Sequence, residues 1–173
     1  MPKIKHNDHP LVEIKKSGIH GHGAYARSKI HNKKRIIEYV GPKITKKEAS
    51  DALSKDLNEY VFTLNDDVDI DGSVDWNIAR YINHSCDPNC ESDIIKDHVW
   101  IIATRTIKEG EELTYNYGYD FEDFETRLCG CGTKKCVGYM VAEEDFEKVR
   151  TMVELEKEVA KKKMKNKKKG KKK

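Results

Sequence analysis

The chain has 173 residues, of which 37% are hydrophobic and 36% charged, which suits one compact domain with an appendage. No apolar run is long enough to span a bilayer, and residues 1–10 lack the apolar stretch of a secretory signal. We therefore expect an intracellular protein without a membrane contact.

Charge divides the chain into an acidic body and a basic tail. Residues 161–173 contain ten lysines and no acidic residue, so residues 1–160 carry 23 basic and 30 acidic side chains, a net charge of −7. The body favours basic partners, and the tail favours anionic ones such as DNA. The tail equally suits a solvated, disordered solubility extension or a nuclear-localisation signal.

Short strands separated by turns follow a leader that we expect at residues 1–10. β-Forming residues with Gly-bearing boundaries predict a mostly β fold with little helix. A Thr45–Glu48 capping box predicts the start of a short helix, and apolar residues at helical spacing predict a C-terminal amphipathic helix. The predicted strands are 11–15, 35–42, 59–64, 68–72, 98–104 and 113–117, with a tight glycine turn at 17–26, helices at 45–53 and 143–161, and a helical turn at 77–82.

Three of the five cysteines, Cys129, Cys131 and Cys136, lie within eight residues. Thiolates at this spacing suit a tetrahedral Zn²⁺ ion, and without a visible secretory signal metal ligation is favoured over disulfides. The fourth ligand is then Cys86 or Cys90, or else a histidine. The alternative is three free cysteines in a loop.

Two other segments concentrate polar and aromatic residues. One is residues 80–90, which contains Asn83-His84-Ser85-Cys86, and the other is residues 110–119, which contains Tyr115, Tyr117 and Tyr119. Taken singly, the first reads as a hydrogen-bonded loop and the second as tyrosines that pack in a core.

Taken together and in this order, these segments resemble the SET-domain protein lysine methyltransferases with a post-SET zinc motif, and most closely the trithorax-type branch. The resemblance covers about residues 11–140 and departs from the family at Trp76-Asn77 and Gly41-Pro42. The matching segments are IHGHG at 19–23, EYVG at 38–41, YVFTL at 60–64, NIARYINHSCDPNC at 77–90, ATRTIKEGEELTYNYGYD at 103–120 and CGCGTKKC at 129–136.

The resemblance implies a mostly β SET fold, in which small curved sheets surround a pseudoknot where residues 80–90 and 113–118 meet. A post-SET zinc loop and a C-terminal helix follow. The implied organisation is a leader at 1–10, the SET domain at 11–120, the post-SET zinc segment at 121–140, the helix at 141–160 and a disordered lysine-rich tail at 161–173.

The resemblance also implies an S-adenosylmethionine-dependent protein-lysine N-methyltransferase. Tyr117 matches the catalytic tyrosine, and Tyr115 matches a position whose hydroxyl limits the space for an already methylated amine. The implied cofactor-binding residues are His20, Gly21, His22, Gly23, Tyr60, Asn83, His84, Tyr117 and Gly130. One structural zinc ion is implied at Cys86, Cys129, Cys131 and Cys136, which leaves Cys90 over.

The acidic body and the family together favour a lysine-rich substrate, namely a histone or a histone-like chromatin protein. We expect the protein in the nucleus or on chromatin or a nucleoid, in a host nucleus if the source is a microbe or virus, and otherwise in the cytoplasm. We also expect a non-specific DNA contact through residues 161–173. The alternatives are an inactive SET module that binds basic tails or nucleic acid, and a zinc-dependent DNA-binding protein, which would need a second basic face.

Overall fold

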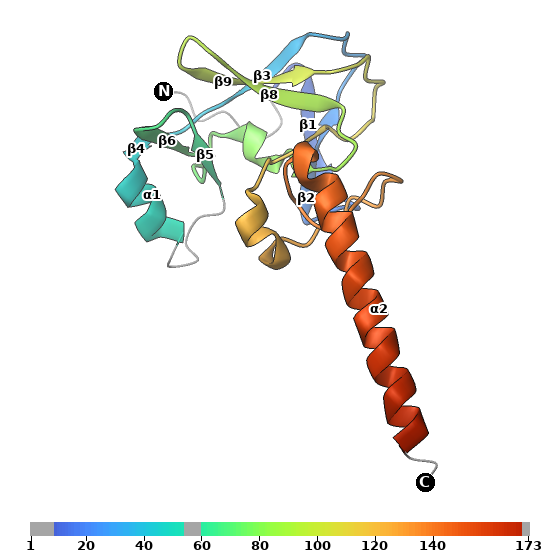
Figure 1. Ribbon diagram of the computed structural model, residues 1–173. Coiled ribbons are helices and arrows are strands. Elements are labelled where there is room, and N and C mark those ends of the chain that lie inside the picture. The colour runs from blue at the N-terminus through green and yellow to red at the C-terminus, as the bar shows by residue number, and fades with distance from the viewer. Residues whose placement is uncertain (1–8, 54–59, 171–173) are drawn as a thin grey trace.

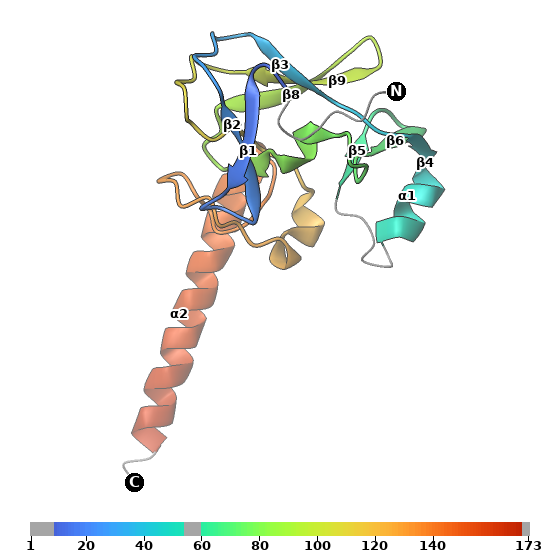
Figure 2. The ribbon, with the colours of Figure 1, turned by 180° about the vertical axis from the view of Figure 1, so that it is seen from behind.

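Four small sheets form the body of the computed structural model, which describes residues 9–53 and 60–170 (Figure 1). Two sheets are three-stranded and antiparallel, in the orders β3-β9-β8 and β4-β6-β5, and β1 and β2 form a hairpin that Figure 2 shows from behind. The strands of these sheets are β1 (Val12–Lys16), β2 (His22–Ala26), β3 (Arg35–Tyr39), β4 (Lys43–Thr45), β5 (Val61–Thr63), β6 (Val68–Asp71), β8 (Cys90–Ile95) and β9 (His98–Ala103).

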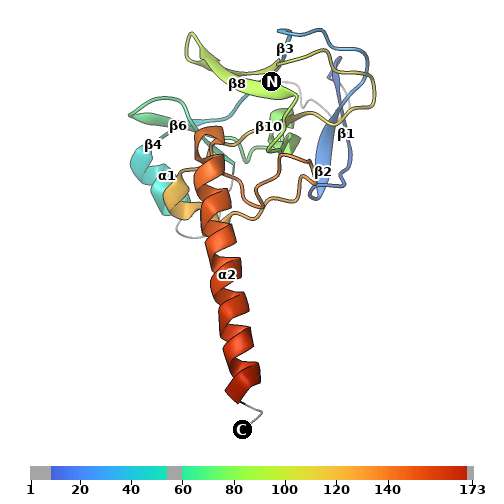
Figure 3. The same cartoon turned by 45° about the vertical axis from the view of Figure 1, so that its right-hand side comes forward.

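The fourth sheet joins two strands that are far apart in the sequence. β7 (Asn83–His84) pairs in parallel with β10 (Thr114–Tyr115), opposing Asn83 to Thr114 and His84 to Tyr115. The Ser85 backbone N–H donates to the Tyr115 carbonyl at 3.1 Å and extends the pairing. Residues 83–85 and 114–115 therefore meet as the pseudoknot prediction requires, and Figure 3 shows β10 in the interior of the fold.

Helices are few and lie outside the sheets. Two are α-helices, α1 (Lys46–Leu53) and α2 (Phe146–Gly170), and three are short 3₁₀ helices, η1 (Ile78–Tyr81), η2 (Phe121–Thr126) and η3 (Glu143–Asp145). α2 projects away from the sheets as a long arm (Figures 1 and 3). No helix in the described ranges is long and apolar enough to cross a membrane.

The buried apolar residues form two clusters. The larger cluster fills the space between the sheets and includes Val12, Ile82, Ile101 and Leu113. The smaller cluster joins the post-SET segment to the start of α2, and its members are Cys86, Phe124, Val137, Val141, Phe146 and Val149. The beginning of α2 is therefore packed, whereas residues further along, such as Leu155, are exposed.

The prediction of a mostly β fold is confirmed, and most predicted strands exist within one to three residues of their expected bounds. The Thr45–Glu48 capping box is present: the Thr45 N–H donates to Glu48 Oε2 at 2.8 Å, and the Glu48 N–H donates to Thr45 Oγ1 at 3.3 Å. The strand predicted at 113–117 is only two residues long, because it pairs with β7, which is itself two residues long. Most of the predicted leader, residues 1–8, lies outside the described residues. So do residues 54–59, which include the first residue of the predicted strand 59–64.

Four strands were missed, namely β2, β4, β7 and β8, and β2 and β8 show why. Residues 22–26 were expected to form part of a turn but form β2, because only the part before His22 turns and Ala24 and Ala26 pack into the core. β8 alternates weakly, since Ile94 is exposed next to the exposed Asp93. Its hairpin with β9 turns at Lys96 and Asp97, which have positive φ values of 52° and 61°, without the glycine that usually marks such a turn.

The C-terminal helix is longer than predicted. The apolar spacing predicts an end near Lys161 and a disordered tail after it, but α2 continues to Gly170. Lysine is a good helix former, and residues 160–169 contain neither proline nor a β-branched residue. The disordered tail over 161–170 is therefore corrected to helix, and residues 171–173 lie outside the described part.

Candidate active site

A cavity of about 890 Å³ opens where the glycine turn, β7 and the strand after β10 meet the post-SET segment. This volume is in the range of pockets that bind small molecules and cofactors. The cavity is lined by tyrosines, by the Asn83–His84 pair and by backbone of the turn at residues 19–22. It therefore gathers residues from four segments that are separate in the sequence.

Tyr115 and Tyr117 both face this cavity, as two residues of one strand edge should. Their ring centroids are 4.9 Å apart, and the Tyr117 hydroxyl donates to the Ile82 carbonyl at 2.9 Å. Tyr115 is buried, and burial, followed by the nearby Tyr117 and Tyr39, raises its pKa well above the usual value for tyrosine. Tyr115 is therefore a neutral phenol at physiological pH.

Tyr39 extends this aromatic wall. Its hydroxyl donates to the Tyr60 carbonyl at 2.8 Å, and burial raises its pKa. Tyr119 packs edge-on to Tyr117 with a centroid distance of 6.0 Å. On this side the cavity thus presents a set of aromatic rings and tyrosine hydroxyl groups.

Asn83 and His84 are buried on β7 and face the cavity from the other side. Burial lowers the pKa of His84 to about 4, so the imidazole is neutral. Its Nδ1 accepts the backbone N–H of Tyr117 at 3.2 Å, and the other ring nitrogen lies 3.6 Å from Cys86 Sγ. The accepting Nδ1 places the proton on Nε2, next to the sulfur.

The turn at residues 17–22 is held against Asn83. The Asn83 side-chain N–H₂ lies 3.3 Å from the His20 carbonyl and 3.1 Å from the His22 carbonyl. Gly21 has a φ of +46°, a conformation that favours glycine at this turn. The turn therefore exposes backbone to the cavity at residues 20–22.

Four cysteines gather at one point beside the cavity. The sulfurs of Cys86, Cys129, Cys131 and Cys136 all lie within 4.8 Å of one another. Burial raises the pKa of the Cys86 thiol to about 11 and also raises that of Cys129. A thiolate cluster of this kind needs a cation to hold it ionised, because four negative charges this close repel one another.

The donor chemistry and spacing fit a single metal ion. Four sulfur donors select zinc or another thiophilic metal over calcium or magnesium. The Cys86 and Cys129 sulfurs are 3.7 Å apart, close to the ~3.8 Å edge of a tetrahedron with metal–sulfur bonds of 2.3 Å. Cys90 is buried in the larger apolar cluster and is not a member of the four-cysteine cluster.

The cysteine loop also covers the glycine turn. Gly130 lies between two of the clustered cysteines and lines the cavity, and a Cβ at this position would approach the Ile19 carbonyl to 3.3 Å. A side chain here would therefore press on the turn, and the four-cysteine cluster lies at one wall of the cavity.

Most of the site residues named from the sequence lie around this one cavity. Of the residues expected to contact the cofactor or the reacting amine, all line the cavity except Gly23. Gly23 instead makes room for the Glu112 side chain, which a Cβ would overlap.

Several cavity residues were missed by the sequence analysis. The cavity is also lined by Tyr39, Phe62 and Arg80. These residues lie in the family-like segments 38–41, 60–64 and 77–90, but they were not assigned a role from the sequence. Glu112 was also missed, since a glutamate in a Gly-Glu-Glu turn usually reads as a solvated surface residue. No pattern along the chain marks contacts made between distant segments.

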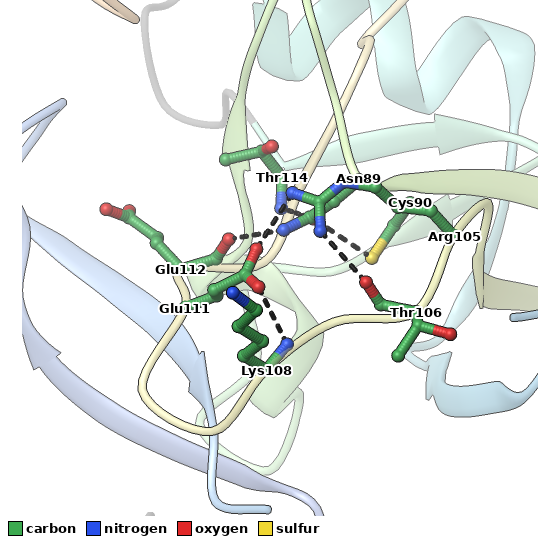
Figure 4. A network of polar contacts seen from close by, with 8 residues as sticks. All are labelled: Asn89, Cys90, Arg105, Thr106, Lys108, Glu111, Glu112 and Thr114. Atoms are coloured by element: carbon green, nitrogen blue, oxygen red, sulfur yellow. Dashed lines mark hydrogen bonds and ion pairs between the residues drawn. The ribbon is translucent and has the colours of Figure 1, made fainter. Parts of the chain in front are cut away.

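Figure 4 shows how the strand that carries the tyrosines is anchored. The buried Asn89 side chain accepts the Thr114 N–H at 2.9 Å and donates to the Glu112 carbonyl at 2.8 Å. The amide thus makes the two backbone hydrogen bonds that a neighbouring strand would otherwise make with residues 112 and 114. Asn89 therefore fixes the position of residues 112–114, just before Tyr115.

Comparison with known proteins identifies the family. A model of the SET domain matches residues 21–118. The chain is 38% identical over 145 residues to the histone-lysine N-methyltransferase trithorax of Drosophila virilis, which covers 79% of this chain and 4% of that protein. It is 37% identical over 142 residues to human histone-lysine N-methyltransferase 2B, covering 77% of this chain and 5% of the relative.

A third relative is the H3 lysine-4 specific histone-lysine N-methyltransferase of Saccharomyces cerevisiae, 40% identical over 140 residues, which cover 75% of this chain and 13% of that protein. The chain thus spans only a small part of the length of these relatives. The matched region contains β7, β10 and the tyrosines that face the cavity. On the residues matched and on the fold, the chain belongs to the SET-domain family.

Proposed function

We propose that the protein is an S-adenosylmethionine-dependent protein-lysine N-methyltransferase that acts on a histone or a histone-like basic protein. The observation that carries the proposal is the convergence of Asn83, His84, Tyr115 and Tyr117 on one cavity through the β7–β10 pairing. The names of the related proteins support a histone substrate.

S-adenosylmethionine supplies a methyl carbon that is already activated by a sulfonium, so the protein supplies alignment and a dry site. The reacting lysine amine must be neutral, and deprotonating a free lysine at pH 7 costs about 4–5 kcal/mol. An aromatic cavity lowers that cost, because burial disfavours the ammonium form. The released proton passes to solvent.

Tyr117 is the proposed catalytic residue. Its hydroxyl hydrogen is engaged by the Ile82 carbonyl, so its oxygen meets an incoming amine as an acceptor. That geometry orients the amine without requiring Tyr117 to be a base. Tyr115, next to it, would limit the room for an amine that already carries methyl groups.

The cofactor would lie against the turn at His20, Gly21 and His22, between Asn83 and His84 on one side and Tyr60 and Gly130 on the other. The fit rests on the cavity's size and on the exposed backbone of that turn. Gly23 follows this turn and would contribute indirectly, because its missing side chain leaves room for Glu112.

The four-cysteine cluster would hold one Zn²⁺ ion, which the sulfur donor set and its spacing support. The ion would link residue 86 to residues 129–136 and so pin the post-SET loop, with Gly130, over the turn. Its role is structural, because four protein ligands leave no open position for substrate.

The substrate surface and location follow from charge and family. The net charge of −7 over residues 1–160 favours a lysine-rich partner. We propose that the protein works on chromatin, in the nucleus or an equivalent compartment, with residues 161–173 providing a non-specific contact with DNA.

The direct test is transfer of a labelled methyl group from S-adenosylmethionine to purified histones and to histones whose lysine amines have been blocked. The proposal expects label only on unblocked protein. Cofactor binding without any transfer would indicate an inactive SET module, and the absence of cofactor binding would reject the proposal.

A further inference from the structure

The side chain of Glu112 gathers three hydrogen-bond donors from three segments of the chain. Ser17 Oγ donates to Glu112 Oε1 at 2.7 Å, and the Asn83 amide donates to the same oxygen at 2.8 Å. The Tyr25 hydroxyl donates to Oε2 at 3.0 Å. Both carboxylate oxygens are thus occupied by side chains of the glycine turn, β2 and β7.

The fold is built to receive this carboxylate. A Cβ at Gly23 would overlap Glu112 Oε1, so a side chain at this position would push the carboxylate out of its present place. The backbone next to Glu112 is also bonded to β2, because the Leu113 N–H donates to the Ala24 carbonyl at 2.7 Å. In Figure 4 the Glu112 side chain points away from the Arg105–Glu111 ion pair on the outer side of the same turn.

A carboxylate only accepts hydrogen bonds, so it selects the nitrogen end of the Asn83 amide. The same nitrogen also faces the His20 and His22 carbonyls. The amide oxygen is therefore turned the other way, and within residues 9–53 and 60–170 no group donates to it. Asn83 lines the cavity, so this oxygen is an acceptor available to a bound molecule.

We propose that Glu112 is a positioning residue: it fixes the Asn83 amide and the turn at residues 17–23 so that the amide oxygen receives the ammonium group of the cofactor's amino-acid part. The ammonium is the strong cationic donor in that part of S-adenosylmethionine, and it is absent from the adenosine part. The inference rests on the proposed function, since it concerns how that cofactor is bound.

The test compares two ligands and two adjacent glutamates. S-adenosylhomocysteine retains the amino-acid part, whereas 5′-methylthioadenosine lacks it. We expect Glu112→Gln to weaken binding of S-adenosylhomocysteine by about tenfold or more, the scale of a hydrogen bond to a charged group. Binding of 5′-methylthioadenosine should stay within about twofold, and the matched control Glu111→Gln should change neither affinity by more than that.

Titration calorimetry of the full chain distinguishes the outcomes. An equal loss for both ligands would make Glu112 merely structural and overturn the inference, as would a Glu112→Gln protein that behaves like Glu111→Gln. A wild-type protein that fails to bind S-adenosylhomocysteine would overturn the proposed function itself.

A second variant covers the case in which Glu112→Gln does not fold. Tyr25→Phe removes one donor to the carboxylate from outside the cavity and leaves Glu112 in place. It should give a smaller loss, of about threefold, again confined to S-adenosylhomocysteine. No difference between the ligands in this variant would contradict the proposal.

Discussion

Tyr115 and Tyr117 are two residues apart and face one cavity, but their surroundings differ. Tyr115 is buried and packs against the Tyr117 ring, whereas the Tyr117 hydroxyl is directed by the Ile82 carbonyl at the cavity wall. The difference leads to opposite expectations for the same chemical change, the removal of one hydroxyl group, and each variant serves as the control for the other.

Tyr117→Phe removes the proposed orienting oxygen while keeping the ring and its packing against His84. We expect the rate of methyl transfer to fall by about 100-fold or more, which is roughly 3 kcal/mol of transition-state stabilisation. The affinity for S-adenosylhomocysteine should change little, as calorimetry would show. A variant with near-normal turnover would remove Tyr117 from the catalytic role.

Tyr115→Phe removes a hydroxyl that, in the proposed function, limits the space around the reacting amine. We expect turnover to persist and the product to shift towards more highly methylated lysine, which mass spectrometry of a peptide product measures. If Tyr115→Phe abolished activity while Tyr117→Phe only altered the product distribution, the two roles would be reversed.

The elements around the site show what the sequence could predict. The capping box at Thr45–Glu48 and the amphipathic start of α2 follow local rules, and they were predicted from the residues alone. The cysteine loop was also visible locally, because three cysteines lie within eight residues. The fourth member of the four-cysteine cluster was not, since Cys86 and Cys90 stood equal until the resemblance and then the fold separated them.

Contacts between distant segments could not be read from local patterns. β7 and β10 are two residues long each, too short to give an alternating signal. The position of β10 is held by the Asn89 side chain, whose two hydrogen bonds to residues 112 and 114 contribute about 1 kcal/mol each. The carboxylate of Glu112 likewise accepts hydrogen bonds from three other segments of the chain, so no local pattern pointed to it.

The cysteine cluster leads to a prediction for the post-SET element. Cys136→Ser removes one of four sulfur donors, so we expect metal content to fall well below one equivalent and methyl transfer to be largely lost. Cys90→Ser is the matched control: it lies in the apolar core and should cost stability but keep one zinc per chain. Elemental analysis of both proteins decides the matter, and full activity of a metal-free protein would contradict the assignment.

On the scale of the whole molecule, charge is distributed unevenly. The first 160 residues are acidic, and ten lysines follow in the last thirteen. α2 carries the first part of that lysine run away from the sheets (Figure 1), so the basic end lies apart from the cavity. Recognition of a lysine-rich substrate and attraction to DNA can then belong to different parts of the chain.

Removal of residues 161–173 tests this separation. We expect unchanged transfer to a short peptide, because α2 packs against the post-SET segment only near its start. Binding to DNA should weaken, and its salt dependence should become shallower as phosphate contacts are lost. Fluorescence anisotropy with labelled duplex measures both, and equal affinity with and without the tail would reduce these residues to a solubility extension.

The central claim is that the aromatic cavity methylates the side-chain amine of lysine. Its most direct test is tandem mass spectrometry of a lysine-rich histone-tail peptide after incubation with the full chain and S-adenosylmethionine, with Tyr117→Phe protein run in parallel. The account predicts mass increments of whole methyl groups on lysine ε-amines with the wild-type chain and almost none with the variant. An unmodified peptide in both reactions, or methyl groups on residues other than lysine, would contradict it.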